Sequence, residues 1–314
     1  MPFIEKFLIV AVLGIGCVVA AVEVCFCVDL ILCRVIKNRK KSPILSKPAI
    51  AAHVIAAAGV LCFCYGYFIE AYWLQVNHFT VETDKLHDAS FRIVQITDTH
   101  CDPKIRNENK MVEIINSLNP DVIVFTGDAI NTPEAMTNFK NAMTELNASL
   151  AKIAIRGNWF KWIDDDDLFS GTGFEVLDCD KMKIEKDGEC IEFAGLNFFN
   201  PAGYDRLLRN NSTDCYNVFL YHTPDLIEDV WQYDVNMYLA GHTHGGQVCL
   251  PFYGAILTFS KFGKKYEAGL YNVGDTTLYV NRGVGMEGGK APRVRFFARP
   301  EIAVFDIVPE GKAN

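Results

Sequence analysis

The sequence lacks a surplus of basic residues. It carries 30 Lys and Arg against 38 Asp and Glu, which gives a net charge of −8, so its overall charge does not attract nucleic acids or other polyanions. It also has no Walker loop, no nucleophilic-serine elbow and no internal repeat. We therefore expect no nucleic-acid partner, and the sequence points to no protein partner. Any contact with a phosphate group must come from a local site.

A pairing pattern of cysteines is also lacking after residue 90. That part contains five cysteines, an odd number, namely Cys101, Cys179, Cys190, Cys215 and Cys249. Their spacing matches no paired framework. Because an oxidising compartment would usually pair such thiols, this spacing favours a reducing one.

Two long apolar runs stand out before residue 75. The first extends from Leu8 to Leu32 with only Glu23 and Asp29 as breaks, and the second covers residues 49–68 with His53 as its one strongly polar residue. Each is long enough to cross about 30 Å of hydrocarbon as a helix. We therefore predict a two-helix transmembrane anchor over residues 1–75. The acidic residues of the first run either face His53 across this hairpin or, for Asp29, lie at the membrane surface.

The segment between the two runs is basic, with Arg34, Lys37, Arg39, Lys40, Lys41 and Lys47. The positive-inside rule places such a loop in the cytoplasm. We therefore predict a multi-pass protein of the inner cell membrane whose residues 75–314 lie outside the cytoplasm, although the cysteine spacing argues the other way. Residues 76–90 are interpreted as a juxtamembrane linker.

From residue 91 the pattern alternates between strands and helices. Helical spacing covers residues 109–118 and 133–146, and residues 174–198 indicate antiparallel hairpins around a turn at Asp187-Gly188. Strands are predicted over residues 91–98, 121–128, 151–158, 218–222, 237–242, 278–283 and 301–308. Strand–helix–strand units imply mostly parallel sheets. We predict an α/β domain over residues 91–314, built as a two-sheet sandwich flanked by helices.

Polar side chains follow five of these strands at the point where each strand ends. They are Asp98, His100, Asp128, Asn158, His222, His242 and His244. The carboxyl ends of strands in an open α/β sheet form sites, so we expect these side chains to meet. Their nitrogen and oxygen atoms suit two divalent metal ions, for which Mn, Fe and Zn all fit.

The ordered motifs Asp-Thr-His, Gly-Asp, Gly-Asn, a lone His and Gly-His-Thr-His resemble the calcineurin-like metallophosphoesterases over about residues 90–308. The segments GHTHGGQ and VNRGVG…RPEIAVFDI resemble the membrane-anchored bacterial branch, which includes UDP-diacylglucosamine pyrophosphatases of lipid A synthesis. The resemblance implies that Asp98, His100 and His244 hold one metal. It gives the other metal to Asn158, His222 and His242, with Asp128 as the bridge. Catalytic roles would fall to Asp128, Asn158 and His222, and two such cations would clamp a phosphoryl group and activate a water.

The sequence departs from that family at Trp159, which stands where the resemblance leads us to expect a general-acid histidine. Its expected acidic partner is likewise replaced, by Asn131. A leaving group that is stable as an anion needs no proton, so this departure favours a diphosphate or another activated phosphoester. The alternative is a metal-binding membrane domain with little or no turnover.

Residues 249–265 are apolar and aromatic and then basic. This segment either lies against the bilayer and admits acyl chains or caps the sheet. Two residues, Arg282 and Trp159, are candidates for contact with the substrate. We predict a membrane-anchored phosphohydrolase whose substrate is a phosphorylated lipid or a nucleotide diphosphate, with UDP-diacylglucosamine or another envelope phospholipid as examples.

Overall fold

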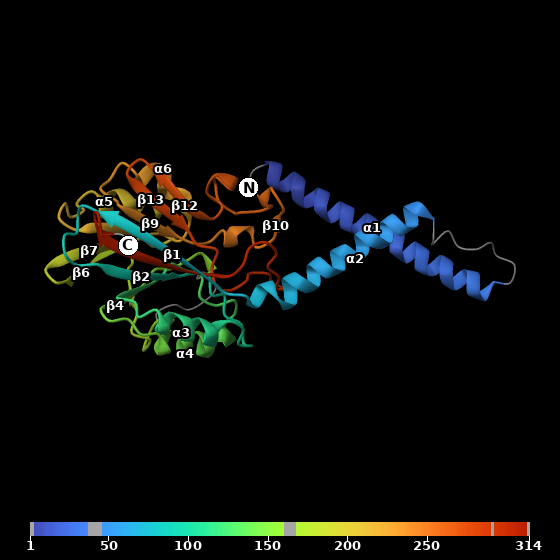
Figure 1. Ribbon diagram of the computed structural model, residues 1–314, viewed down its shortest axis with the longest axis horizontal. Coiled ribbons are helices and arrows are strands. Elements are labelled where there is room, and N and C mark those ends of the chain that lie inside the picture. The colour runs from blue at the N-terminus through green and yellow to red at the C-terminus, as the bar shows by residue number, and fades with distance from the viewer. Residues whose placement is uncertain (1–2, 37–45, 160–167, 290–291, 313–314) are drawn as a thin grey trace.

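The computed structural model describes residues 3–36, 46–159, 168–289 and 292–312. Two long helices extend from a two-sheet domain and cross each other (Figure 1). They are α1 (Phe3–Val35) and α2 (Lys47–Phe68). By length and composition, Gly14–Val35 and Lys47–Tyr72 could each cross a membrane. Most of the predicted basic loop, residues 37–45, lies outside the described residues.

The predicted contact across the hairpin is present. The Nδ1 atom of His53 lies 2.8 Å from both carboxylate oxygens of Glu23, and the ring of Phe26 packs edge-on against the imidazole. A polar pair inside an apolar hairpin is favourable only when its members meet, so this contact fixes how the two helices face each other.

The first sheet has six strands in the order β1-β14-β2-β3-β4-β5. Its strands are β1 (Gln75–Thr83), β2 (Phe91–Ile96), β3 (Val122–Phe125), β4 (Ala151–Ala154), β5 (Glu175–Val176) and β14 (Glu301–Pro309). All pairs are parallel except β14 with β2. Strand β3 reads VIVF and is wholly buried, as expected of a central parallel strand covered on both faces.

The second sheet has six strands in the order β12-β13-β9-β8-β7-β6. Its strands are β6 (Asp180–Lys186), β7 (Glu189–Gly195), β8 (Tyr216–Leu220), β9 (Met237–Ala240), β12 (Gly269–Val273) and β13 (Thr276–Val280). The β6–β7 pair is the predicted antiparallel hairpin. A small separate hairpin pairs β10 (Cys249–Leu250) with β11 (Gly254–Ala255).

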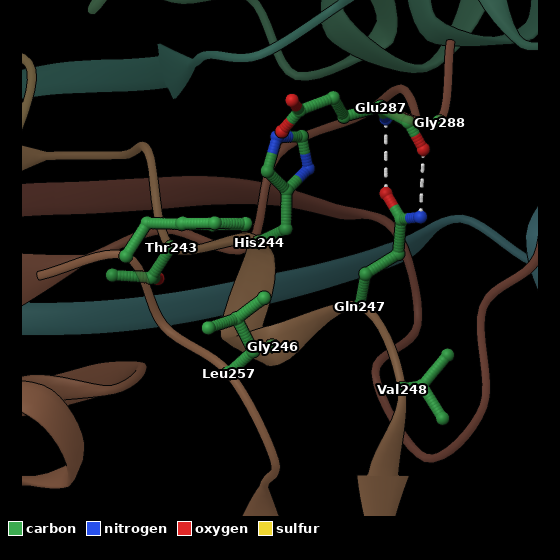
Figure 2. A pocket seen from close by; sticks show the side chains of 9 residues that line it. Thr243, His244, Gly246, Gln247, Val248, Leu257, Glu287 and Gly288 are labelled. Atoms are coloured by element: carbon green, nitrogen blue, oxygen red, sulfur yellow. Dashed lines mark hydrogen bonds between the residues drawn. The ribbon is translucent and has the colours of Figure 1, made fainter. Parts of the chain in front are cut away.

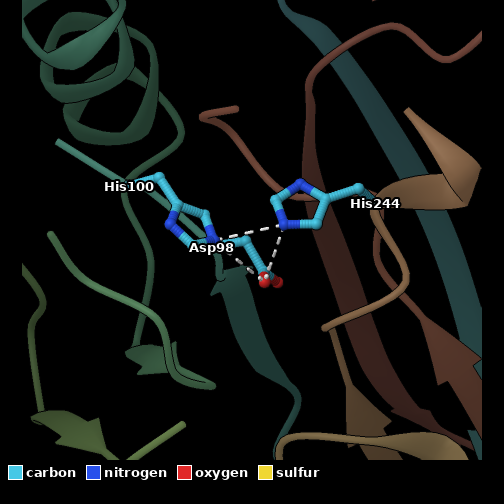
Figure 3. A group of neighbouring side chains, drawn as sticks. All are labelled: Asp98, His100 and His244. Atoms are coloured by element: carbon cyan, nitrogen blue, oxygen red, sulfur yellow. Dashed lines mark hydrogen bonds and ion pairs between the residues drawn. The ribbon is translucent and has the colours of Figure 1, made fainter. Parts of the chain in front are cut away.

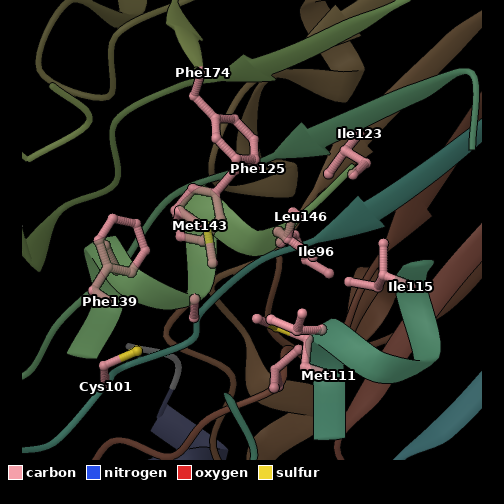
Figure 4. Close-up of a cluster of buried hydrophobic side chains, with 14 of the residues drawn as sticks. Ile96, Cys101, Met111, Ile115, Ile123, Phe125, Phe139, Met143, Leu146 and Phe174 are labelled. Carbon is pink, nitrogen blue, oxygen red and sulfur yellow. The ribbon is translucent and has the colours of Figure 1, made fainter. Parts of the chain in front are cut away.

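Helices cover the outer faces of both sheets, which confirms the predicted sandwich. They are α3 (Glu108–Ser117), α4 (Met136–Glu145), α5 (Tyr204–Leu208) and α6 (Ile227–Val230). Short 3-10 turns are η2 (Glu70–Tyr72), η3 (Pro133–Ala135), η5 (Pro201–Gly203), η6 (Pro224–Leu226), η7 (His244–Gly246) and η8 (Gly263–Tyr266). Met111 and Ile115 of α3 and Phe139 and Met143 of α4 pack on the first sheet beside Phe125 (Figure 4). A second apolar core fills the space between the two sheets.

The end of α2 is joined directly to the domain. The backbone N–H of Arg295 donates to the carbonyl of Gly66 at 3.2 Å, and the ring of Tyr65 meets Phe296 edge-on at 6.2 Å. The N–H of Cys249 in β10 donates to the carbonyl of Phe296 at 2.8 Å. The β10–β11 hairpin therefore lies next to the end of the second apolar helix.

Two predictions from the sequence are wrong. Residues 76–83 are not part of a linker, because they belong to β1, which pairs along its whole length with β14. The cysteines are not all unpaired either. Strands β7 and β8 are parallel neighbours, which brings Cys190 to Cys215 in a disulfide with a Cα–Cα distance of 4.9 Å.

Candidate metal centre

The structure brings all seven predicted ligands together where the two sheets meet. Each follows the last residue of a strand by a few positions. Strands β2, β3 and β4 of the first sheet are followed by Asp98, His100, Asp128 and Asn158, and strands β8 and β9 of the second by His222, His242 and His244. The structure therefore places each of these side chains just beyond the carboxyl end of a strand.

Asp98, His100 and His244 form the first group of ligands (Figure 3). The Nε2 atoms of the two imidazoles are 3.2 Å apart, and Asp98 Oδ1 lies 3.4 Å from His244 Nε2. This oxygen is buried and has no hydrogen-bond partner. A buried carboxylate oxygen without a partner is costly, and a cation held between these three side chains would satisfy it.

Asp128, His222 and His242 form the second group. Asp128 Oδ2 lies 3.1 Å from His222 Nε2 and 3.7 Å from His100 Nε2 of the first group. The Oδ1 atom of Asn158 lies 3.0 Å from His222 Nε2. Asp128 thus faces both groups, and the donors are those that fit a pair of divalent metal ions.

The backbone at the ligands is unusual. Twelve non-glycine residues of the described chain have positive φ, and five of them are Asp98, His100, Asp128, His242 and His244. Such conformations are costly and gather at functional sites. Two glycines permit the close approach, because a Cβ on Gly157 would overlap the Asp128 carboxylate and one on Gly241 would overlap Asp98. These side chains therefore come together at the cost of local backbone strain.

Comparison with known proteins agrees with this geometry. The model of the calcineurin-like phosphoesterase family matches residues 91–246. The metallophosphoesterase YkuE of Bacillus subtilis is 35% identical over 275 residues, which cover 82% of this chain and 93% of YkuE. The chain belongs to the calcineurin-like metallophosphoesterases. A more distant relative is the UDP-2,3-diacylglucosamine pyrophosphatase LpxG of Chlamydia muridarum, 26% identical over 82% of this chain and 96% of LpxG.

Burial and neighbouring charges shift the pKa values of several side chains in the metallophosphoesterase site. Burial raises the pKa of Asp98 to about 6. Burial opposes the charged form of His222, yet the Asp128 carboxylate outweighs it and raises the pKa of His222 to about 9. Burial lowers the pKa of His242 to about 4. In the metal-free protein, one proton is therefore held mainly between Asp128 and His222.

Two residues orient the histidines of the metallophosphoesterase site. Asn131 Oδ1 lies 3.0 Å from His100 Nδ1, and its Nδ2 donates to the His100 carbonyl at 2.7 Å. The carbonyl oxygen of Thr126 lies 2.7 Å from His222 Nδ1. Hydrogen bonds on Nδ1 leave Nε2 free to bind a metal. The sequence marked Asn131 only as a departure from the family, and its role in holding His100 was missed.

The two predicted substrate contacts lie in different places. The backbone N–H of Trp159 donates to Asp128 Oδ1 at 2.9 Å, and its indole meets His100 edge-on at 5.4 Å. Trp159 is therefore part of the wall of the site. Arg282 instead forms an ion pair with Glu301, and its Nε donates to that carboxylate at 2.5 Å. It lies outside both ligand groups, so its contact with substrate stays a prediction.

A pocket of about 350 Å³ opens beside the first ligand group. His244 and Glu287 line one side of it, and Val248, Leu257 and Phe259 supply apolar surface. Figure 2 shows the side chain of Glu287 turned toward the imidazole of His244. One candidate ligand of the metallophosphoesterase, His244, thus lines a partly apolar cavity.

Proposed function

We propose that this chain is a membrane-anchored phosphohydrolase that uses two divalent metal ions to cleave a phosphoester or diphosphate bond of a lipid-linked substrate. The observation that carries the proposal is the pair of adjoining ligand groups, one member of which, His244, lines a partly apolar pocket. When bound, the two ions would clamp the phosphoryl group and lower the pKa of a water. Mn, Fe and Zn all suit these ligands.

The residues of the chain itself have distinct tasks in this proposal. Asp128 faces both ligand groups and would hold both ions. Asn158 and His222 lie 3.0 Å apart and would fix the second ion. Trp159 closes the site beside His100 and excludes water from one side of it, which strengthens every charge interaction within.

The region next to α2 supports a substrate drawn from a membrane. Phe252 in the β10–β11 turn and Phe259 after it are exposed aromatic side chains, and Phe259 also lines the pocket. Lys261 and Lys265 follow in the chain and are exposed; they pair with Asp229 and Glu228 of α6 and would lie among lipid headgroups. The alternative is that residues 249–265 only cap the sheet.

Two observations support an extracytoplasmic position of the domain. The disulfide between Cys190 and Cys215 suits an oxidising compartment, because cytosolic thiols are kept reduced. The basic residues between the two apolar helices favour a cytoplasmic loop. On that side of the membrane, an envelope phospholipid or lipid diphosphate is the favoured substrate.

A second candidate substrate is UDP-diacylglucosamine. It is favoured by the likeness to LpxG, which extends over 82% of this chain. UDP-sugars are cytoplasmic, so this candidate requires the opposite orientation of the domain. A reporter fused to the C-terminus that is active on only one side of the membrane separates the two candidates.

The proposal is tested with the full-length protein in lipid nanodiscs containing manganese. Phosphatidic acid, a lipid diphosphate and UDP-diacylglucosamine are compared with their short-chain, water-soluble counterparts. We expect a higher kcat/KM for the long-chain form of at least one substrate. Equal rates for long and short chains would refute the lipid part of the proposal, and no turnover with two ions bound would favour a metal-binding domain without turnover.

A further inference from the structure

A second cavity, the junction cavity, lies where the end of α2 meets the domain (Figure 1). Its volume is about 660 Å³. Phe63 and Tyr67 of α2 form one side, and their rings stack with centroids 5.7 Å apart. Lys104 and Arg106 from the loop after β2, together with Arg293 from the loop before β14, contribute to the rest of the lining. None of these lining residues belongs to either ligand group, so the junction cavity is separate from the metal centre.

Hydrogen bonds hold the walls of the junction cavity together. Arg106 Nη1 donates to the hydroxyl oxygen of Tyr72 at 3.0 Å. Next to it, Asn107 Nδ2 donates to the carbonyl of Ala71 at 2.9 Å. Tyr72 and Ala71 belong to η2, which begins two residues after α2 ends. The loop that carries the basic side chains is therefore fixed to the segment that leaves the apolar helix.

Positive charge exceeds negative charge in the junction cavity. Among the described residues that line it, Lys104, Arg106 and Arg293 are basic and Asp102 is the one acidic residue. Asp102 is shared, because Arg106 Nε donates to one of its oxygens at 3.0 Å and Arg293 Nη2 to the other at 3.1 Å. Lys104 is exposed. Arg293 Nη1 is buried and has no hydrogen-bond partner within the described part of the chain. The two guanidinium groups therefore keep donor capacity and charge that Asp102 does not use.

This combination of surfaces matches a phospholipid. Guanidinium groups bind phosphate oxygens with charge-assisted hydrogen bonds, and basic pockets beside membrane helices suit anionic headgroups. Phe63 precedes Tyr67 by about one helical turn, lies within the apolar span Lys47–Tyr72 and is 47% exposed. A molecule that fills the junction cavity would thus meet cations at one end and the apolar face of α2 at the other. A soluble phosphate would leave that apolar face uncovered.

We propose that the junction cavity binds one anionic phospholipid, with its phosphate among Lys104, Arg106 and Arg293 and its acyl chains along α2. The inference rests on the membrane anchor of the proposed function and goes beyond its chemistry, because this lipid is a bound partner and not the hydrolysed substrate. Such a lipid would hold the domain at a fixed position on the bilayer surface.

The test measures lipid binding to the full-length protein by native mass spectrometry. The protein is freed of lipid in detergent and titrated with phosphatidylglycerol, with phosphatidylcholine or with glycerol phosphate. We expect the first phosphatidylglycerol to bind about 10-fold or more tighter than phosphatidylcholine, since each basic residue near an anionic headgroup contributes about 5-fold. Glycerol phosphate at the same concentration should not displace it, because it lacks acyl chains.

The variants remove charge and leave Asp102 in place, because Asn131 also donates to that carboxylate. Lys104→Gln combined with Arg293→Gln should weaken phosphatidylglycerol binding by about 25-fold and leave phosphatidylcholine binding unchanged. The matched control combines Lys183→Gln with Lys312→Gln. These are exposed residues of β6 and of the chain after β14, and Figure 1 shows β6 at the end of the domain opposite to α2. The control should bind both lipids as the wild type does.

Lys104→Gln alone keeps the test decisive if Arg293→Gln impairs folding. This exposed residue should be replaceable without a change in Tm, with a loss of about 5-fold in phosphatidylglycerol affinity. Equal affinity of the wild type for both lipids, displacement by glycerol phosphate, or an equal loss in the control pair would overturn the lipid site. Absence of hydrolysis with both metal ions bound would overturn the proposed chemistry alone, because lipid binding is measured without turnover.

Discussion

The two six-stranded sheets supply different atoms to the site. The first sheet contributes the oxygen ligands Asp98, Asp128 and Asn158 together with His100, whereas every ligand from the second sheet is a histidine. Each ligand group nevertheless takes side chains from both sheets. Neither sheet could therefore hold either metal ion alone, and the apolar core between the sheets sets the geometry of the site.

The largest effect should come from Asp128, because this first-sheet residue faces both ligand groups. Replacing it with alanine should lower kcat/KM by about 10³-fold or more, equivalent to the several kcal/mol that a metal pair contributes to the transition state. Hydrolysis and metal content are measured together. Asp275→Ala, in an exposed turn of the second sheet, is the control. Retention of both ions and full activity in Asp128→Ala would refute its bridging position.

The next largest effect should come from the disulfide of the second sheet, whose loss should change the stability of the fold but not metal binding. Opening the Cys190–Cys215 bridge, which spans 25 residues, should lower the free energy of unfolding by about 3 kcal/mol. Denaturant unfolding of the Cys190→Ser, Cys215→Ser double variant checks this, with Cys179→Ser, a free cysteine, as control. The folded double variant should still bind two ions. Unchanged stability would mean that the bridge does not form in the native protein.

Metal removal should weaken the connection between the sheets. Manganese at about 100 times its Kd should stabilise the fold by about 2.7 kcal/mol, seen as a higher Tm than in chelator. His222 has a pKa of about 9 without metal, so at pH 7 binding must expel its proton. Affinity should therefore rise from pH 7 to pH 9. Calorimetry in buffers of different protonation enthalpy measures the released proton, and zero release contradicts this charge assignment.

The smallest effect should distinguish the two ligand groups. Asn131→Ala removes the side chain that holds His100 and should weaken the ion at the first group by about 10–100-fold. The ion at the second group should be unaffected. Metal titration resolves the two sites. Asn138, whose side chain donates to the backbone carbonyls of Asp102 and Pro103, is replaced by alanine as the control. Equal weakening of both ions would mean that the groups are not independent.

The parts of the molecule that could be predicted are those in which a local pattern determines the outcome. Asp98, Asp128, Asn158 and His222 were identifiable because each follows an apolar strand at the carboxyl end of that strand. The Glu23–His53 contact was predictable because polar side chains in an apolar hairpin need partners. Strands β2, β3 and β4 were predictable because each is an apolar run that ends shortly before one of these polar side chains.

The missed features depend on contacts between distant segments. Strand β1 has a mixed polar sequence and is specified by β14, which lies more than 200 residues later. The cysteine pairing depends on β7 and β8 being neighbours. Glu287 lies on a loop without a motif, and the side chain of Gln247 bonds to its backbone N–H and carbonyl. No periodicity in the sequence could indicate these contacts.

The most direct test of the central claim is anomalous diffraction from crystals grown with manganese. We predict two peaks about 3.5–4 Å apart, one within Asp98, His100 and His244 and one within Asp128, His222 and His242. Each ion should thus be bound by side chains from both sheets. A single peak, or two ions each held by one sheet alone, would contradict the account.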